Sequence, residues 1–305
     1  MVTPARTLGY SLFGRRFDYL LHLRPLEWPI MAAHTAVGYV LAVGVTGARS
    51  GQEVGPALLG LLLWVVFLNG GTLALNSAFD RDEGDVAYLR KPPPPPVRLA
   101  AFSLALMAAG QLAAFALPAG YTVAYALCFV LSILYSVPPL RLKAVAGADW
   151  AINMWGFGTL TPYAGWAATG IPVDAARGLV LLGFCPLFAA LYPLTQLYQL
   201  EEDIRRGDRT LASALGAARS LDAALGAALV AFVLFAAGAV RAGWRLPADG
   251  WRWALLALAG VAWAAVLIPW RTRAAGHSPA ERQRRMYRAL AAWAVTDVVV
   301  VVVWG

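Results

Sequence analysis

The sequence is poor in charge, in lysine and in cysteine. Only 14% of its 305 residues are charged, against about 25% in soluble globular domains. Lysine occurs only at Lys91 and Lys143, and cysteine only at Cys128 and Cys185. Both cysteines lie inside apolar runs, which is typical of small core residues rather than of a disulfide or a metal site. Because 60% of the residues are hydrophobic, the composition excludes a soluble globular domain and predicts a membrane protein with several spans.

The amino-terminal segment also lacks the long apolar core of a cleavable signal peptide. Its first twenty residues contain Arg6, Arg15, Arg16 and Asp18 instead. We therefore expect residues 1–24 to form a cytoplasmic lead-in to the first membrane span.

Long apolar runs dominate the rest of the chain. A helix needs roughly 20 apolar residues to cross a hydrocarbon core of about 30 Å, and nine runs have about that length. The sequence thus predicts an all-α integral membrane protein with nine transmembrane helices, folded as one domain over residues 1–305. The predicted spans are 25–46, 55–78, 98–117, 119–137, 148–168, 175–198, 219–240, 251–270 and 287–304.

The arginines and lysines divide unevenly between the two sides that this topology defines. Twenty of the 25 fall on the side of the amino terminus and five on the other. Because basic residues are enriched in cytoplasmic loops, we expect the amino terminus in the cytoplasm and the carboxyl terminus outside, in the cell membrane of a bacterium or an archaeon. Anionic lipid headgroups account for the net charge of +8, so we expect membrane lipid and no nucleic acid as a partner.

Two short acidic stretches stand where apolar runs end, and together they hold eight of the seventeen carboxylates. We expect them in cytoplasmic loops, 79–97 and 199–218. In the first, Asn76 and Asp80 are four residues apart and Glu83 follows one turn later, so a helix would turn all three to one face. Mg²⁺ prefers oxygen ligands and takes one or two carboxylates together with phosphate oxygens, so this face is a candidate metal half-site. The alternative is a solvated helix end with ordinary surface charges.

The second stretch repeats this pattern. Gln196, Gln199 and Asp203 are three and four residues apart, which gives a helix one polar stripe, and Glu202 lies beside it. The two stretches therefore predict two half-sites that together hold Mg²⁺ ions at the cytoplasmic face.

A segment rich in proline and basic residues, Tyr135–Lys143, lies between the two stretches. Arginine binds phosphate oxygens in a bidentate manner and lysine acts as a point charge, so Arg141 and Lys143 are candidate contacts for a diphosphate. Arg90 and Lys91 are candidates for the same reason. For all four cations the alternative is a role as anchors at the cytoplasmic membrane face.

These three motifs, in this order and on one predicted side, resemble those of the UbiA superfamily of intramembrane prenyltransferases. The resemblance extends from Arg24 to the ninth predicted span. It implies a UbiA-like helical bundle around a central cavity, open laterally to lipid, whose cytoplasmic end binds an isoprenyl diphosphate through Mg²⁺. The motifs are Asn76-x-x-x-Asp80-Arg-Asp82, Tyr135-Ser-x-Pro138-Pro-x-Arg141-x-Lys143 and Gln199-x-x-Glu202-Asp203-x-x-x-Gly207-Asp208-Arg209-Thr210.

The resemblance also implies roles for single residues. The chain departs from the family pattern at Gly84 and Gln199, where acidic residues are common. These departures change which side chains can serve as metal ligands. Arg24 would lie near the acceptor, and Tyr135, Asn153 and Gln199 complete the predicted substrate-binding set. The implied metal ligands are Asn76, Asp80 and Asp203, with Glu83 and Glu202 beside them, and the implied diphosphate contacts are Arg141 and Lys143.

The implied reaction is the Mg²⁺-dependent transfer of an isoprenyl group to a lipophilic acceptor, with release of diphosphate. Neutralising the diphosphate lets the allylic C–O bond break toward a carbocation, which aromatic faces such as those of Tyr192 and Tyr198 stabilise by about 0.5–2 kcal/mol each. An aromatic carboxylate, phenol or quinone precursor is the first candidate acceptor, and a polyene or tetrapyrrole end group is the second.

Two other functions compete with this interpretation. A membrane terpene cyclase of the same fold would act on the isoprenyl diphosphate alone. An ion-coupled transporter would place its ligands on interrupted helices near the bilayer midplane, whereas these stretches stand at helix ends.

Three further polar sites lie in or beside the predicted spans. His34 is a candidate general base or a hydrogen-bonded packing residue. Asp149 and Asn153, four residues apart, either line the cavity or begin a helix. Asp297 lies in a valine-rich run, and the sequence suggests no role for it.

Overall fold

A computed structural model of the chain describes residues 4–80, 89 and 91–305, apart from the side chains of residues 4, 5, 202, 206 and 275. Within these residues the chain is helical, with one isolated β-bridge between Val145 and Arg209. The predicted all-α fold class is confirmed. Glu83 and Arg90 lie outside the described residues, and so does the side chain of Glu202.

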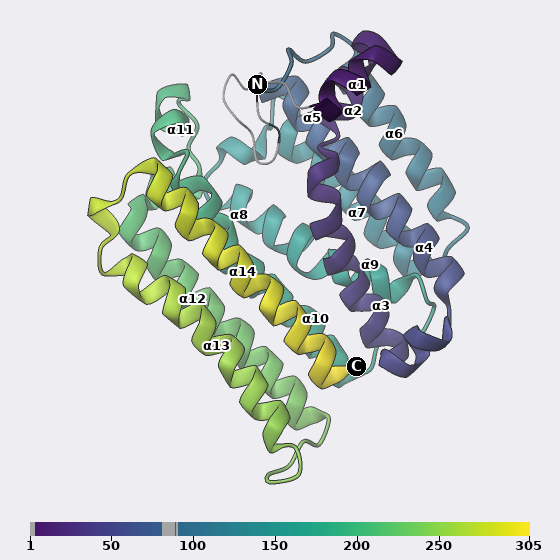
Figure 1. The fold of residues 1–305 in the computed structure, drawn as a ribbon, viewed down its shortest axis with the longest axis vertical. Helices are drawn as coiled ribbons and strands as arrows, with labels where there is room; N and C mark the ends of the chain where they lie inside the picture. Colours follow the sequence, from purple (N-terminus) through teal and green to yellow (C-terminus); the bar gives the residue numbers. More distant parts are fainter. Residues whose placement is uncertain (1–3, 81–88, 90) are drawn as a thin grey trace.

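Apart from the interval between Asp80 and Leu99, short connections join the helices. A short amino-terminal group, α1 (Pro4–Phe13), η1 (Gly14–Arg16) and α2 (Phe17–His22), lies across one end of the bundle near α5 and α6 (Figure 1). The remaining elements are η2 (Pro25–Glu27), α3 (Trp28–Ser50), α4 (Val54–Leu62), η3 (Leu63–Gly70), α5 (Gly71–Asp80), α6 (Leu99–Ala114), α7 (Ala119–Ser136), η4 (Leu142–Ala144), α8 (Ala148–Asn153), η5 (Met154–Leu160), α9 (Thr161–Ala167), α10 (Ala175–Leu197), α11 (Leu200–Arg206), α12 (Leu211–Arg241), α13 (Gly250–Arg271), η6 (Ala274–Gly276) and α14 (Pro279–Trp304).

Seven helical segments among the described residues are long and apolar enough to cross a membrane, and each coincides with a predicted span. The run predicted at 98–117 is helical as α6, but its 16 residues extend only about 24 Å. The run predicted at 148–168 is divided among α8, η5 and α9. The chain is therefore a multi-pass membrane protein, while the count of nine transmembrane helices stays a prediction.

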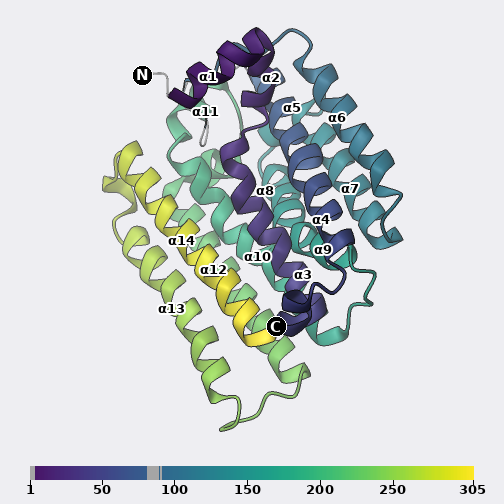
Figure 2. The same ribbon diagram turned by 45° about the vertical axis from the view of Figure 1, so that its right-hand side comes forward.

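The long helices form two packed halves. In both views α12 and α14 lie beside α10 with α13 outside them, while α4, α6 and α7 lie on the other side of α3 (Figures 1 and 2). One hydrophobic core joins α10, α12, α13 and α14, and a second joins α4, η3, α6, α7 and α9. Helix α3 contributes to both, through Val37 and Leu41 in the first and Met31 in the second. It therefore forms the seam between the halves.

Two glycines bring α3 against α9. A Cβ atom on Gly38 would overlap the carbonyl oxygen of Pro162, and one on Gly165 would overlap the carbonyl oxygen of Thr35. Each helix thus presents a glycine to the backbone of the other. This close approach fixes the position of the seam helix relative to α9.

The segment 199–218, predicted as a loop, is largely helical, so that prediction was wrong. Helix α11 ends at Gly207, which has a positive φ of 75°, and α12 begins after Thr210, whose hydroxyl accepts a hydrogen bond from the Ser213 amide at 3.3 Å. A kink at Gly216 interrupts α12. Because α11 is short and strongly charged, its sequence has no apolar run that would distinguish it from a loop.

Two π-helical stretches, η3 and η5, interrupt the helices of the amino-terminal half. Such stretches are rare and are frequently found at functional sites. The Trp64 indole of η3 donates to the Thr161 hydroxyl at 3.2 Å, and that hydroxyl donates to the Gly156 carbonyl of η5 at 2.9 Å. The two stretches are therefore joined, and residues of both line the cavity described next.

Candidate active site

A cavity of about 430 Å³ lies between the two halves of the bundle. At one end it is lined by polar side chains that include Asn76, Asp80 and Asp203. Its remaining wall is apolar and aromatic, with contributions from α3, η3, α7, η5, α10 and α14 that include Leu131 and Phe157. The cavity therefore resembles a ligand-binding site with one charged end and one apolar end.

The first acidic motif reaches the cavity from the last turns of α5. Asn76 and Asp80 lie four residues apart on this helix, as predicted, and both line the cavity. Lys143 forms an ion pair with Asp80 and donates to the Asn76 side-chain oxygen at 3.3 Å. The Asp80 side chain is only 6% exposed, so its charge depends on this partner.

Arg141 stands behind the cavity wall and binds two carboxylates. Its guanidinium donates to both oxygens of Asp208, at 2.6 and 3.3 Å, and lies 3.5 Å from Asp80. A bidentate pair of this kind is geometrically specific. Arg141 and Lys143 therefore draw the carboxylates of both motifs together, although 67 residues separate Arg141 from Asp208.

The second motif surrounds the same polar end. Gln199, Asp203, Asp208 and Thr210 all line the cavity. The Thr210 hydroxyl donates to Asp203 at 3.4 Å. Asp208 and Thr210 stand in this motif, but their spacing in the sequence did not predict a role for either of them.

Asp149 holds the segments on either side of the second motif in position. It is fully buried, and its carboxylate accepts hydrogen bonds from the Gly147 amide at 2.8 Å, the Gln196 side chain at 2.7 Å and the Leu211 amide at 2.9 Å. Gln196 in turn accepts from the Ala212 amide at 3.1 Å. The carboxylate thus ties the start of α8 to the end of α10 and the start of α12. Of the two roles considered for Asp149, these contacts favour a role at the start of a helix over one in the cavity wall.

Three other predicted substrate-binding residues, Arg24, Tyr135 and Asn153, lie in the cavity wall. Arg24 lines the cavity and donates to the Ser77 hydroxyl at 3.3 Å, beside Asn76. The Tyr135 hydroxyl lies 2.9 Å from that of Tyr192, and Asn153 donates to the Asp149 carbonyl at 2.8 Å. Lys91 does not line the cavity; its side chain is exposed, and its carbonyl accepts from Arg6 at 2.9 Å.

Aromatic rings lead from the charged end into the apolar part of the cavity. Tyr192 stacks on Phe188 at a centroid distance of 6.3 Å, and Phe188 stacks on Phe157 at 5.3 Å. Tyr198 also lines the cavity, and its hydroxyl is available as a hydrogen-bond donor.

The donors at the charged end suit a hard cation. Asn76, Asp80, Asp203 and Asp208 all offer oxygen atoms, and Mg²⁺ takes one or two carboxylates, water and substrate phosphate oxygens. Within the described residues, no three histidine, cysteine or acidic side chains are grouped closely enough to hold a metal by themselves. The donor set therefore fits a cation shared with a phosphorylated ligand better than one enclosed by protein alone.

The family model of the UbiA prenyltransferase family matches residues 32–293 of the chain. The chain is also 29% identical over 233 residues to the lycopene elongase/hydratase of Halobacterium salinarum, a similarity that covers 74% of this chain and 82% of that protein.

Two solved structures share the fold. A UbiA homolog from Archaeoglobus fulgidus bound to GPP and Mg²⁺ has a TM-score of 0.65 at 21% identity, covering 93% of this chain and 99% of that one. A digeranylgeranylglyceryl phosphate synthase has a TM-score of 0.68 at 14% identity, covering 94% of this chain and 97% of that one.

Proposed function

Because the chain belongs to the UbiA prenyltransferase family, it is a prenyltransferase, and we propose that it transfers an isoprenyl group from an isoprenyl diphosphate to a lipophilic acceptor. The observation that carries this proposal is the polarity of the cavity. Acids and a lysine stand at one end, and an apolar, aromatic wall forms the rest. An isoprenyl diphosphate has the same division, with a charged head and an apolar tail.

The cations at the charged end suit the diphosphate. In the structure Lys143 and Arg141 neutralise Asp80 and Asp208. Both cations bind phosphate oxygens as well as they bind carboxylates, so a diphosphate would compete with the acids for them. The carboxylate oxygens released in this exchange would be free to bind metal.

We propose that Asn76, Asp80 and Asp203 hold Mg²⁺, the ion present with GPP in the Archaeoglobus fulgidus homolog, with Glu83 and Glu202 as further candidates. A bound Mg²⁺ would neutralise the diphosphate as a Lewis acid and make it a better leaving group. Gln199 lines the cavity and offers a carbonyl oxygen without charge. Among the acids, we expect Asp80 and Asp203 to contribute most to metal binding.

The apolar wall suits the second half of the reaction. The C–O bond between the isoprenyl carbon and the diphosphate breaks, and the diphosphate leaves with the electron pair. The positive charge left on carbon would face Tyr135, Tyr192 and Phe188, whose rings stabilise a cation by about 0.5–2 kcal/mol each. An unsaturated acceptor then forms the new C–C bond and loses a proton.

We propose that the acceptor is a lipid-soluble aromatic compound or a polyene. The charged end of the cavity is accounted for by the diphosphate, so the apolar wall is what an acceptor would contact. The 29% identity to the lycopene elongase/hydratase of Halobacterium salinarum supports testing a carotenoid polyene beside the aromatic acceptors. Both classes enter through lipid rather than through water.

The test is diphosphate release by purified protein in lipid nanodiscs. Geranyl, farnesyl and geranylgeranyl diphosphates are supplied with and without Mg²⁺, and with and without aromatic and polyene acceptors. We expect release that needs both Mg²⁺ and an acceptor. Release without acceptor, with a cyclic hydrocarbon as product, would replace the transferase by the cyclase; no release from any donor would overturn both.

A further inference from the structure

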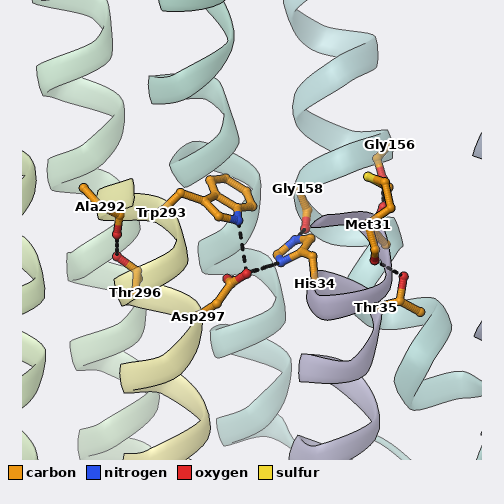
Figure 3. A network of polar contacts seen from close by, with 10 residues as sticks. Met31, His34, Thr35, Gly156, Gly158, Ala292, Trp293, Thr296 and Asp297 are labelled. Atoms are coloured by element: carbon orange, nitrogen blue, oxygen red, sulfur yellow. Dashed lines mark hydrogen bonds and ion pairs between the residues drawn. The ribbon is translucent and has the colours of Figure 1, made fainter. Parts of the chain in front are cut away.

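His34 and Asp297 form a buried polar network that the proposed chemistry does not use (Figure 3). The Asp297 carboxylate lies 3.0 and 3.2 Å from Nδ1 of His34 and accepts a hydrogen bond from the Trp293 indole at 3.1 Å. Nε2 of His34 lies 3.3 Å from the Gly158 carbonyl. The His34 and Asp297 side chains are only 4% and 12% exposed.

Every polar atom of the imidazole has a partner. Both ring nitrogens of His34 face acceptors, so Nε2–H donates to the Gly158 carbonyl and a proton is shared between Nδ1 and the Asp297 carboxylate. The pair is neutral as a unit, which lowers the cost of placing it at membrane depth. A fully satisfied buried network of this kind holds its side chains in one arrangement.

The network lies one helical turn beyond the apolar end of the cavity. Met31, Phe188 and Leu290 line the cavity. On the same helices, three or four residues further from the charged end, lie three ring-bearing residues that do not line the cavity. They are His34 on α3, Phe184 on α10 and Trp293 on α14. We call His34, Phe184, Trp293 and Asp297 the ring layer.

Helices α3, α10 and α14 each have one end at the charged end of the cavity. Helix α3 starts beside Arg24, and α10 ends just before Gln199, both at the charged end. Helix α14 starts at the same end, because the Arg282 guanidinium donates to the Leu197 carbonyl at 3.3 Å. All three helices therefore place their member of the ring layer on the far side of the cavity.

The ring layer is packed directly against the cavity wall. The Trp293 ring meets Phe188 edge-on at a centroid distance of 5.3 Å, and His34 meets Trp293 at 4.7 Å and Phe184 at 5.1 Å. An indole that donates to Asp297 cannot swing aside without breaking that hydrogen bond. The layer is thus a rigid floor.

We propose that the ring layer sets the depth of the cavity and thereby the isoprenyl chain length that the enzyme prefers in its donor. This inference rests on the proposed function, since it assigns the apolar end of the cavity to the donor's tail. Because the carboxylate of Asp297 holds two of the three rings, it acts as a positioning residue and does not touch the substrate.

The test compares two tryptophans in the same protein. Trp293→Ala removes the ring that supports Phe188. Trp263→Ala is the matched control, because Trp263 is also buried, donates to Thr296 at 3.1 Å and does not line the cavity. The readout is the ratio of kcat/KM among geranyl, farnesyl, geranylgeranyl and geranylfarnesyl diphosphates, with acceptor and Mg²⁺ saturating.

For Trp293→Ala we expect the ratio of the next longer donor to the wild-type optimum to rise by about tenfold or more, since single methylene groups are discriminated by about 10- to 200-fold in apolar sites. Trp263→Ala should keep the wild-type ratio even if its thermal stability falls. Trp293→Phe and His34→Ala should shift the ratio in the same direction by smaller factors, and they serve if the alanine variant does not fold.

An unchanged length profile in folded Trp293→Ala or in both smaller variants would overturn the proposal. So would a shift seen only in the preferred acceptor, because the floor would then belong to the acceptor's site. If the wild-type protein turns over no isoprenyl diphosphate at all, the proposed function fails first, so the two failures are distinguishable.

Discussion

The cavity has a carboxylate network at each end, and the two networks are built differently. At the charged end, Asp80 and Asp208 share Arg141, whose side chain is 29% exposed, and Lys143 serves Asp80 as well. At the apolar end, Asp297 holds His34 and Trp293 in a site closed to solvent. The first network has surplus partners that can be exchanged for a ligand, whereas the second is complete without one.

This difference follows from the partners available at each depth. Arginine and lysine have several donors and flexible stems, so they can leave one acceptor for another. Imidazole and indole are short and rigid, and here each donor nitrogen already faces an acceptor. A carboxylate in this bundle is therefore available for ligand binding where its partners are mobile cations, and structural where its partners are rings.

Removing the central acid of the exchangeable network should have the largest effect. We expect Asp80→Ala to lower kcat/KM for diphosphate release by about 10³-fold or more, since a proposed ligand of the metal that binds the leaving group is lost. Asp203→Ala should act similarly. Asp222→Ala is the control, because Asp222 pairs with Arg271 at an exposed site away from the cavity. Full activity in correctly inserted Asp80→Ala would remove Asp80 from the site.

The closed network should respond through stability. Asp297→Ala leaves His34 and Trp293 without their acceptor, and we expect the free energy of unfolding to fall by about 3–5 kcal/mol. A double variant, His34→Phe with Asp297→Leu, replaces the imidazole and the carboxylate by apolar groups and should recover the part of the loss that comes from the unpaired imidazole, while the Trp293 indole stays without its acceptor. Thermal unfolding in detergent measures both, and equal losses in the single and double variants would speak against a closed pair.

Asp149 lies between these extremes, since it is buried but binds mainly backbone amides. Asp149→Asn should lower the free energy of unfolding by about 1–3 kcal/mol, because one amide hydrogen is turned toward a donor. Activity should fall as the start of α12 shifts. Asp174→Asn is the matched control: Asp174 accepts from the Ala176 and Arg177 amides at the start of α10, where asparagine caps as well as aspartate. Similar losses in both variants would argue against a special role for Asp149.

The smallest effect should come from single cations at the exchangeable end. We expect Lys143→Gln to raise the KM for the isoprenyl diphosphate by about tenfold, equivalent to about 1.4 kcal/mol, with a smaller change in kcat. Lys91→Gln tests the other lysine, which the sequence also nominated but which lies outside the cavity wall. A larger KM effect at Lys91 than at Lys143 would reverse the assignment.

The sequence contains enough information to predict the helical class and much of the charged end. Asn76 and Asp80 were predicted to share a face because four residues separate them on one helix, a local spacing that the tertiary structure leaves unchanged. Arg141 and Lys143 were predicted as phosphate contacts from residue type, and they do lie at the acids.

What could not be predicted depends on contacts between distant segments. Asp149 reaches Leu211 across 62 residues, and His34 reaches Asp297 across 263. A single sequence contains no signal for such pairs, so Asp297 had no assigned role until its partner was located. The helix α11 was missed for a different reason, since its charges give it the composition of a loop.

The π-helical stretch η3 gives the first motif its direction. Each residue of an α-helix turns the chain by about 100°, and η3 lies only a few residues before Asn76 and Asp80. If one residue were deleted there, an ordinary α-helix would form and the two side chains would rotate away from Lys143 toward neighbouring helices. A change of one residue in the length of this apolar span would thus abolish activity, as the loss of an acid would. Selection therefore acts on the length of the span as well as on the residues of the motif.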